Sequence, residues 1–469
     1  MIRRRLAAAA LVLGTLLSSP AAWAESLADT LVGAYRHSAL IEQNRAVLRA
    51  ADEDVAAAMA SLRPVVQWAA AHNFQQVDGA EGVSSSLEIA AQMTLFDWGR
   101  NQLAIDIAKE QVLATRESLV AVEQDVLLGA VRAFLDVRSA EQQVALQENS
   151  VTVLTRERQA AQDRFDVGEI TSTDVALAEA QLAASRAARA AAQGQLEIAR
   201  ESYRAAVGRA PGRLDPPPPL PKRPASLEAA QGTARGSHPA IRQSKRTVAA
   251  AELGVAAAAA ERSPTITGSV SLGTTRSSSD STAITGASRI TRDPSTLSAG
   301  IQANQTLYSG GRLPAVHRRA MAQRDSARSA LLNISRQVDE SVAVAWANID
   351  VARAQIGAID EQISAAQQAY EGVREEAMLG ARTTLDVLDA EQNLLQARAD
   401  KITAEANLQL AHYQLLASMG LLTVEHLKLG IPTYDPSAYY NAVRNAPYTS
   451  TQGENLDRVL RAIGKQPRN

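Results

Sequence analysis

The feature that most restricts the fold of this chain is an internal repeat. An offset of 200 residues aligns the starts of the two copies, and an offset of 212 residues aligns the rest. The second offset persists without a gap for more than 100 residues. The aligned pairs include Ser26 with Ser226, Pro64 with Pro264, Leu95 with Leu307, Gly168 with Gly380, and Asp174 with Asp386. The chain is therefore a tandem duplication of one structural unit.

The change of offset locates an exposed loop. The difference of 12 residues (212 minus 200) falls between the aligned prolines, Pro64 and Pro264, and the aligned leucines, Leu95 and Leu307. Loops tolerate insertions, whereas packed elements do not. We therefore expect a loop in this segment and rigid packing in the ungapped stretch after it.

The same segment carries alternating apolar and polar residues in both copies. Residues 87–95 alternate in the first copy, and residues 266–272 and 297–303 alternate in the second. A period of two indicates β-strands with one polar face, and runs of about 10 residues suit strands that cross a membrane at a tilt. The sequence predicts β-hairpins at about 64–96 and 264–308.

The expected turns of these hairpins are the Gly-, Ser- and Thr-rich segments at 78–84 and 277–293. A soluble hairpin set into a helical protein remains the alternative interpretation. If the strands are membranous, four per chain cannot close a barrel, because the smallest known barrels have about eight strands. An open edge in lipid leaves backbone groups unpaired, so the chain then has to oligomerise.

Long helical patterns follow both hairpins. Each long segment has about 65 residues and forms a rod of roughly 100 Å at 1.5 Å per residue. A helix of that length needs neighbours packed along it in coiled-coil fashion, and alanine-rich faces permit a close approach. The expected helices are 27–62, 100–165 and 172–208 in the first repeat, and 227–262, 312–378 and 384–420 in the second.

Glycine and threonine mark the turns between the long helices and the return helices. Gly168 and Gly380 end the long helices, because glycine readily takes the left-handed conformation of a helix C-terminus. Thr171 and Thr383 lie where an N-cap starts each return helix, and acids in the first turn suit the helix dipole.

The N-terminus is typical of a signal peptide for export from a Gram-negative cytoplasm. Three arginines at 3–5 precede an apolar stretch at 6–17, and Ala22-Trp23-Ala24 offers a cleavage site before Glu25. The predicted order is signal peptide 1–24, first repeat 25–210, proline-rich connector 211–224, second repeat 225–428, and a partly disordered C-terminal extension 429–469.

Composition excludes several function classes. The chain has no cysteine, which excludes disulfides, thiolate metal sites and an N-terminal lipid anchor on cysteine. A formal net charge of −2 offers no argument for nucleic-acid binding. The six histidines are scattered, and no catalytic or phosphate-binding motif is present. We therefore expect no enzyme activity, no metal and no cofactor.

Several motifs resemble those of the TolC outer-membrane efflux family. The helix turns carry Val-Gly-Glu-Ile-Thr-Ser-Thr-Asp-Val at 167–175 and Gly-Ala-Arg-Thr-Thr-Leu-Asp-Val-Leu-Asp-Ala at 380–390. The strand-to-helix junctions carry Leu-Phe-Asp-Trp-Gly-Arg at 95–100 and Leu-Tyr-Ser-Gly-Gly-Arg at 307–312. The similarity covers about residues 27–428 and is nearest to members that serve type I secretion.

The resemblance implies an α+β membrane protein. Four transmembrane β-strands per protomer would contribute to a trimeric 12-stranded β-barrel in the outer membrane of a Gram-negative bacterium. A long periplasmic α-helical barrel, built from the two tandem repeats, would continue the β-barrel. The implied partners are the other chains of a homotrimer, a periplasmic adaptor protein, an inner-membrane ABC or proton-driven transporter, and outer-membrane lipid.

The resemblance also implies a pore constriction at Asp386 and Asp389. Threefold symmetry would place six carboxylates in one charge-selective ring. For Asp386, an ordinary role at the helix start remains the alternative, because its copy Asp174 is also an acid. The copy of Asp389 is Leu177, so a helix start does not require that acid.

Gating and docking residues follow from the same resemblance. Arg382 corresponds to the family's gating arginine, and Thr173 and Asp174 correspond to its partners on the neighbouring turn. Ala377 stands where the family has a gating tyrosine, which departs from the pattern. The implied adaptor-docking tips are Gly168, Glu169, Ile170, Thr171, Gly380, Ala381 and Thr383.

The implied function is an exit duct that passes proteins, small molecules or both from an inner-membrane transporter to the exterior. Type I protein secretion is the favoured system, and multidrug efflux is the alternative. A soluble periplasmic coiled-coil adaptor is a more distant alternative, since such a protein has no use for matched strand pairs in both repeats.

Overall fold

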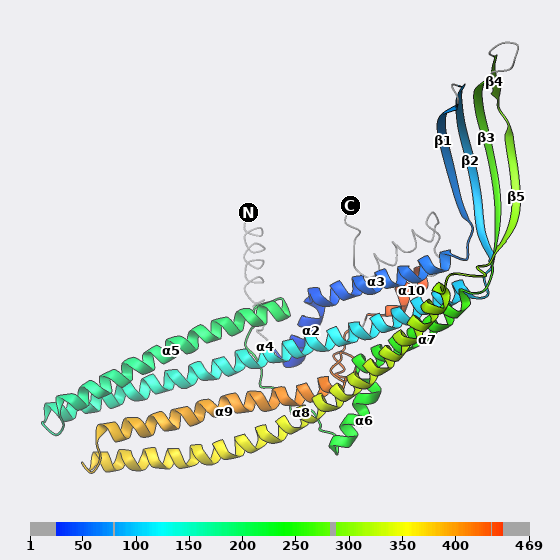
Figure 1. Ribbon diagram of the computed structural model, residues 1–469. Coiled ribbons are helices and arrows are strands. Elements are labelled where there is room, and N and C mark those ends of the chain that lie inside the picture. Colours follow the sequence, from blue (N-terminus) through cyan, green and yellow to red (C-terminus); the bar gives the residue numbers. More distant parts are fainter. Residues whose placement is uncertain (1–24, 78–79, 282–287, 433, 444–469) are drawn as a thin grey trace, which may run out of the picture. The chain divides into compact units, whose positions relative to one another are not determined.

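The computed structural model describes residues 25–77, 80–281, 288–432 and 434–443 (Figure 1). These residues divide into two compact units. The first contains the described residues of Met1–Asn44, Val120–Pro239 and Ser335–Thr433, and the second those of Arg45–Leu119, Ala240–Ile334 and Tyr434–Asn469. The predicted signal peptide at 1–24 lies outside the described residues.

Each repeat contains an antiparallel helical hairpin. The long helices α4 (Arg100–Asp166) and α8 (Arg312–Met378) have 67 residues each. They turn back into α5 (Ser172–Val207) and α9 (Thr384–Ser418), and in Figure 1 α5 lies alongside α4 and α9 alongside α8. None of the described helices has an apolar stretch sufficient to cross a bilayer.

Each repeat begins with two helices instead of the single helix expected. They are α2 (Leu27–His37) and α3 (Ala39–Ala60), and α6 (Leu227–Ser237) and α7 (Pro239–Ala260). Ser38 and His238 at the corners have extended backbone angles. The Ser38 hydroxyl accepts a 3.2 Å hydrogen bond from the Ile41 amide and so caps α3. Pro239 disfavours a helical His238 but is tolerated as the first residue of α7.

The strands form one antiparallel sheet within the second unit. They are β1 (Val65–Val77), β2 (Ala80–Phe96), β3 (Thr265–Ser281), β4 (Ser288–Arg292) and β5 (Ser295–Asn304). β2 pairs with β1 and β3, whereas β4 and β5 pair with successive parts of β3. In the described part of the chain, β1 and β5 are therefore edge strands, each with one side unpaired.

One face of this sheet is largely apolar in the half next to the helices. The register places Trp68 beside Ile89, Ile89 beside Leu272, and Leu272 beside Leu297, while Ser, Thr and Gln side chains predominate on the opposite face. Trp68 and Leu297 are both 73% exposed. The apolar face is thus not buried in a core of the chain, which argues against the soluble-hairpin alternative.

The hairpins extend further than the alternation predicted. The turns predicted at 78–84 and 277–293 contain paired strand residues, such as Ser84 opposite Asn73 and Ser277 opposite Arg292. The prediction of turns over these full ranges is therefore wrong. Serine and threonine occupy both faces of the sheet here, so the pairing continues without a hydrophobic period of two.

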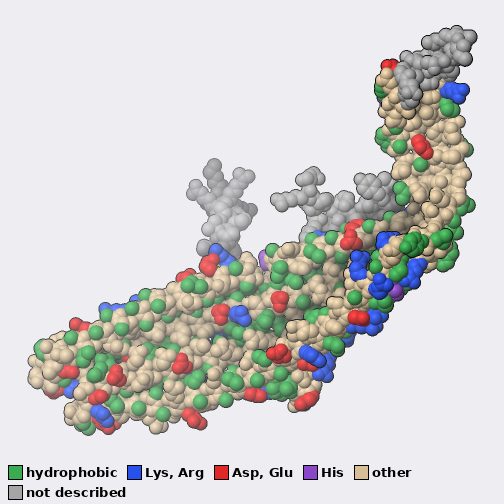
Figure 2. All heavy atoms as spheres, in the orientation of Figure 1, with side chains coloured by type: hydrophobic (Ala, Val, Ile, Leu, Met, Phe, Trp, Pro, Cys, Tyr) green, Lys and Arg blue, Asp and Glu red, His purple; other side chains and the backbone are tan. Residues whose placement is uncertain are grey.

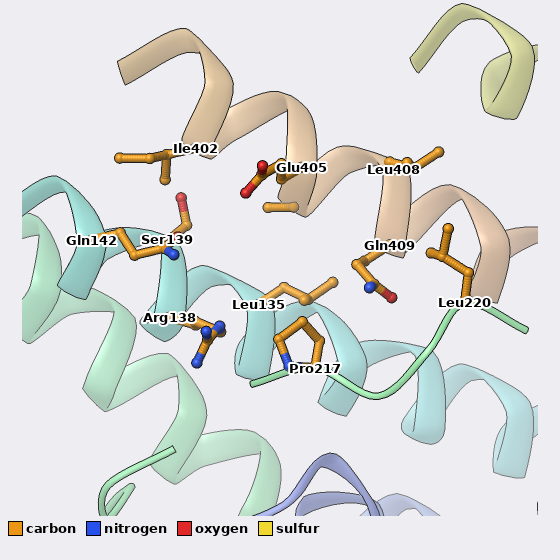
Figure 3. Close-up of a pocket in the computed structure, with 11 residues that line it drawn as sticks. Leu135, Arg138, Ser139, Gln142, Pro217, Leu220, Ile402, Glu405, Leu408 and Gln409 are labelled. Carbon is orange, nitrogen blue, oxygen red and sulfur yellow. The ribbon is translucent and has the colours of Figure 1, made fainter. Parts of the chain in front are cut away.

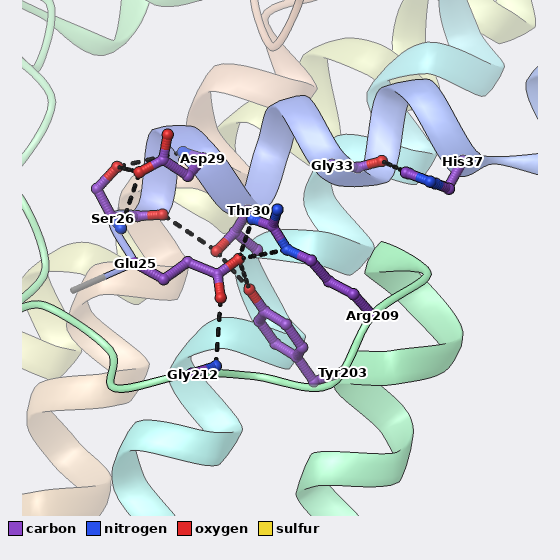
Figure 4. A network of polar contacts seen from close by, with 9 residues as sticks. All are labelled: Glu25, Ser26, Asp29, Thr30, Gly33, His37, Tyr203, Arg209 and Gly212. Carbon is purple, nitrogen blue, oxygen red and sulfur yellow. Dashed lines mark hydrogen bonds and ion pairs between the residues drawn. The ribbon is translucent and has the colours of Figure 1, made fainter. Parts of the chain in front are cut away.

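The first described residue, Glu25, ties α2 to the end of α5 (Figure 4). The Tyr203 hydroxyl donates a 2.7 Å hydrogen bond to Oε1 of Glu25, and Arg209 forms an ion pair with the same carboxylate. The Tyr203 hydroxyl also lies 2.8 Å from that of Thr30. Both hydroxyl contacts are buried, so this network fixes α2 in place.

The proline-rich connector at 211–224 lies against α4 and α9 (Figure 3). Arg138 of α4 donates a 3.1 Å hydrogen bond to the carbonyl oxygen of Asp215. Pro217 and Leu220 of the connector, together with side chains of α4 and α9, line a cavity of about 210 Å³. The connector is therefore a packed part of the first unit.

Part of the predicted C-terminal extension is helical. Helix α10 (Pro436–Val443) packs within the second unit, where the Tyr439 hydroxyl donates a 2.8 Å hydrogen bond to Glu53 of α3. The guanidinium of Arg116 in α4 lies 5.5 Å from the ring centre of Tyr440. The sequence did not predict this helix, because eight residues are too few to establish a helical period.

Candidate gate at the helix turns

The two turns between long helix and return helix share one backbone design. Gly168 and Gly380 have left-handed φ angles of 79° and 78°, which glycine adopts without steric cost. The amide of the next residue, Glu169 or Ala381, donates a 2.9 Å hydrogen bond to a carbonyl of the last helical turn. The repeat in sequence thus produces a repeat of the turn.

Each return helix begins with a capping box. The Thr171 hydroxyl accepts from the Asp174 amide, and the Asp174 carboxylate accepts from the amide and hydroxyl of Thr171. Thr383 and Asp386 make the same contacts. They lower the pKa of both acids, chiefly through the Thr171 hydroxyl for Asp174 and the Thr383 amide for Asp386. The predicted N-caps are confirmed, and both acids contribute to a helix start.

Arg382 binds within its own hairpin. Its Nε donates a 2.9 Å hydrogen bond to Glu376 at the end of α8, and this contact raises the pKa of the guanidinium. Thr173 is exposed, and the Asp174 carboxylate is engaged by the capping box. Among the described residues, the structure does not bring Arg382 to either of these predicted partners.

Asp389 and Ala377 have contrasting environments. The Asp389 side chain is exposed in the first turns of α9. Ala377 is only 5% exposed and lines a cavity of about 250 Å³ between α4, α8 and α9, whose wall also includes Arg156 and Glu157. Ala377, the expected counterpart of the gating tyrosine, is therefore a small side chain beside open space.

A buried acid, Glu391, lies one helical turn beyond Leu388, which lines the same cavity. Oε1 of Glu391 accepts a 3.2 Å hydrogen bond from Ser150, which in turn accepts from Ser185 at 3.3 Å. Oε2 has no hydrogen-bond partner in the described part of the chain. Burial raises the pKa of Glu391 to about 7, the Ser150 bond lowers it, and the negative charge of Glu157 raises it.

Glu391 was not among the predicted site residues, and its copy Glu179 is also an acid. The structure separates the two acids. Glu179 is exposed and lies 3.8 Å from Arg158, whereas Glu391 is buried. One signal was present, since Glu391 lies three residues after Leu388 and three before Leu394, on the apolar stripe of the helix.

The turns expose apolar side chains. Leu379 is 86% exposed, Val167 72% and Met378 68%. Close beside them lie the ion pair of Arg164 with Glu169 and that of Arg382 with Glu376. Apolar side chains with a charged rim suit a contact with another protein.

These groups supply charge, hydrogen bonding and apolar surface. The described residues contain no group of three or more His, Asp or Glu side chains placed to hold a metal ion. The carboxylates at the turns can attract cations, and the exposed apolar side chains can contact another protein.

Sequence comparison extends over most of both repeats. The family model described as "Outer membrane efflux protein" matches residues 33–209 and 231–421. The outer membrane efflux protein BepC of Brucella suis is 35% identical over 440 residues, which cover 94% of this chain and 95% of BepC. The alkaline protease secretion protein AprF of Pseudomonas aeruginosa is 24% identical over 326 residues, which cover 68% of this chain and 66% of AprF.

The fold is also found in a solved structure. The outer membrane protein VceC of Vibrio cholerae superimposes with a TM-score of 0.69 over 84% of this chain and 96% of VceC. The sequence identity of 20% limits this likeness to the fold.

Proposed function

The chain belongs to the outer membrane efflux protein family, whose members are channels in the Gram-negative outer membrane, and from this premise we propose that three copies form the exit duct of a tripartite export system. In this proposal the sheets of three chains close one β-barrel, and the helical hairpins continue it as a tunnel. Membership of this family also argues against the alternative of a soluble periplasmic adaptor.

The two open edges of the sheet, β1 and β5, carry the proposal. Unpaired backbone N–H and C=O groups cost several kcal/mol each in lipid, so a single sheet with free edges is unstable there. Pairing β1 of one chain with β5 of the next satisfies both edges and keeps every apolar face on the outside. Three copies of the long strands β1, β2, β3 and β5 give twelve strands, above the minimum of about eight.

The helix turns form the gate in this proposal. Asp386 and Asp389 of three chains make a ring of carboxylates that favours cations at the constriction. Arg382 holds the turn of its own hairpin through Glu376 in the single chain, and in the trimer it lies where Thr173 and Asp174 of a neighbouring chain can compete for it. Gating then consists of an exchange of partners by Arg382.

The tips of the hairpins dock the periplasmic adaptor, which links the duct to an inner-membrane transporter. The side chains of Val167, Met378 and Leu379 favour this assignment, because they are apolar, lie beside the turns at Gly168 and Gly380, and are exposed in the described part of the chain. The remaining docking residues are Glu169, Ile170, Thr171, Ala381 and Thr383.

Type I protein secretion is the system we favour. The name of AprF, a relative over 68% of the chain, refers to secretion of an alkaline protease. Multidrug efflux is the second candidate, because BepC, which is more similar, is named an efflux protein. Deletion of the gene separates the two: loss of a secreted protein from the medium supports secretion, and sensitisation to toxic small molecules alone supports efflux.

Disulfide cross-linking tests the assembly, since the chain has no cysteine of its own. Variants combine Gln67→Cys or Asn73→Cys on β1 with Ser298→Cys or Gln302→Cys on β5. We expect at least one pair to give covalent trimers in outer-membrane fractions, whereas each single variant stays monomeric in denaturing gels. Cross-links confined to one chain, or a soluble monomer, would contradict the duct.

A further inference from the structure

The junctions between strands and helices all carry arginine. Arg63 precedes β1, Arg100 follows β2, Arg262 precedes β3, and Arg312 follows β5. We call these residues the junction arginines. Figure 2 shows Lys and Arg side chains gathered on the helices next to the strands, while few charges lie on the strands.

Hydrogen bonds draw three of these junctions together. Arg100 donates a 3.1 Å hydrogen bond to the carbonyl oxygen of Ser263, and Gln305 donates a 3.2 Å bond to the carbonyl oxygen of Arg262. The segments after β2, before β3 and after β5 are thereby joined. Arg100, Arg262 and Arg312 therefore belong to segments that lie together in the second unit.

Three junction arginines keep their charge available. Arg63, Arg262 and Arg312 are exposed, and none forms an ion pair with another described residue. The Asp97 carboxylate binds the amides of Gly99 and Asn101 at 3.0 and 2.8 Å and forms no ion pair with these three arginines. Within the described residues, their guanidinium groups therefore have no direct carboxylate partner.

An apolar groove begins beside Arg63. Pro64, the next residue, lines this groove of about 700 Å³ together with Met93, Leu95, Val270 and Ile301, on the apolar face of the sheet. The floor lies at Gly268, where a Cβ atom would come within 3.1 Å of the Leu95 side chain. A side chain at position 268 would therefore crowd Leu95 and take up space in the groove.

Aromatic side chains occupy the same level as the arginines. Phe96 and Trp98 pack edge to face with ring centres 4.5 Å apart, and Tyr308 is 89% exposed. Exposed Trp and Tyr side chains are typical of the boundary between membrane and water. The groove therefore lies on the membrane side of this boundary, and the arginines lie at it.

We propose that the groove and the junction arginines form a binding site for an anionic phospholipid of the periplasmic leaflet. One acyl chain lies over Gly268, and the phosphate group contacts Arg63 with support from Arg262 and Arg312. Complementary charge selects a headgroup with net negative charge over a zwitterionic one. The site rests on the outer-membrane location of the strands and is independent of the exported substrate.

Native mass spectrometry of the full-length protein in detergent tests this site. The probes are phosphatidylglycerol, phosphatidylcholine with the same acyl chains, and inorganic phosphate. We expect retention of phosphatidylglycerol alone, with about a fivefold loss for each arginine removed in Arg63→Gln and Arg262→Gln. The matched control is Arg336→Gln, which removes an exposed arginine elsewhere on α8.

A second variant, Gly268→Leu, fills the groove and leaves the arginines intact. It should weaken phosphatidylglycerol retention to the level of Arg63→Gln. Equal retention of both phospholipids, competition by inorganic phosphate alone, or no effect of the arginine and glycine variants would overturn the proposal. Channel conductance in phosphatidylcholine bilayers reports on the duct separately, and it should be unchanged in all variants.

Discussion

The Ser150 hydroxyl in α4 donates a 3.2 Å hydrogen bond to Oε1 of Glu391 in α9, and so links the two helical hairpins of the chain. The contact adjoins a small apolar cluster of Leu154, Leu182 and Leu388. A carboxyl group, one of whose oxygens has no hydrogen-bond partner among the described residues, is thereby held between α4 and α9.

Stability should therefore depend on pH through Glu391. Its pKa is raised from 4.5 to about 7 in the folded chain, so the folded state binds the proton more tightly than the unfolded state. The stabilising contribution is complete below about pH 4.5 and is lost as pH rises through 7. Glu391→Gln should reduce the loss of thermal stability between pH 5 and pH 8.

The matched control for this prediction is Glu179→Gln, which changes the exposed copy of the same acid. The melting temperature of purified protein at both pH values is the measurement. A pH dependence that is identical in wild type and Glu391→Gln would contradict the prediction. Glu157 and Tyr370 are the other titratable groups near Glu391, so their variants belong in the same series.

Loss of the Arg382 side chain should increase leakage through the channel. Arg382→Ser removes the contact with Glu376 that holds the turn of this hairpin, so the open state of the channel should gain weight. Single-channel recording should show larger or more frequent open currents for Arg382→Ser and for Glu376→Gln. Arg186→Gln on α5 is the control, and currents unchanged from wild type in both turn variants would count against the gate.

Restoring the family's tyrosine should tighten the closed channel. Ala377 borders a cavity of about 250 Å³, so a tyrosine at this position has room without the strain of overpacking. Ala377→Tyr should lower leak currents and leave the melting temperature close to that of wild type. A large drop in melting temperature would show that the cavity does not accept the ring.

Asp389 should set part of the cation preference of the channel. Its carboxylate is exposed, whereas that of Asp386 is bound in the capping box, so Asp389→Asn alters charge with little effect on the helix start. In asymmetric salt, the reversal potential of Asp389→Asn should lie closer to zero than that of wild type, because the variant channel prefers cations less strongly. Asp163→Asn on α4 is the control, and an unshifted potential for Asp389→Asn would place this acid outside the constriction.

Removal of the Tyr203 hydroxyl should weaken the attachment of α2. Tyr203→Phe loses the buried contacts with Glu25 and Thr30 and should destabilise the first unit by about 1 to 3 kcal/mol. Chemical denaturation compared with Tyr308→Phe, an exposed control, measures the effect. Equal stability of both variants would mean that the network contributes little.

Local sequence signals predicted the elements that repeat. The glycines and threonines of the turns acted as expected, because a left-handed φ at Gly168 and a capping hydroxyl at Thr171 depend only on a few neighbouring residues. The corner at Ser38 was missed, since one residue leaves the helical period almost unchanged. The outer part of β3 was missed because its Ser and Thr side chains lack a hydrophobic alternation.

The sequence by itself determined the duplication, the alternating strands, the long helices and the turns, because each follows from backbone preferences or from spacing along the chain. Only the tertiary structure decided that Glu391 is buried while its copy Glu179 is exposed, that Arg382 binds Glu376, and that Gly268 lines a groove beside Arg63. The physical reason is that burial, ion pairing and open space depend on which neighbouring element faces a side chain. Two copies of one local pattern therefore acquire different chemistry when their neighbours differ.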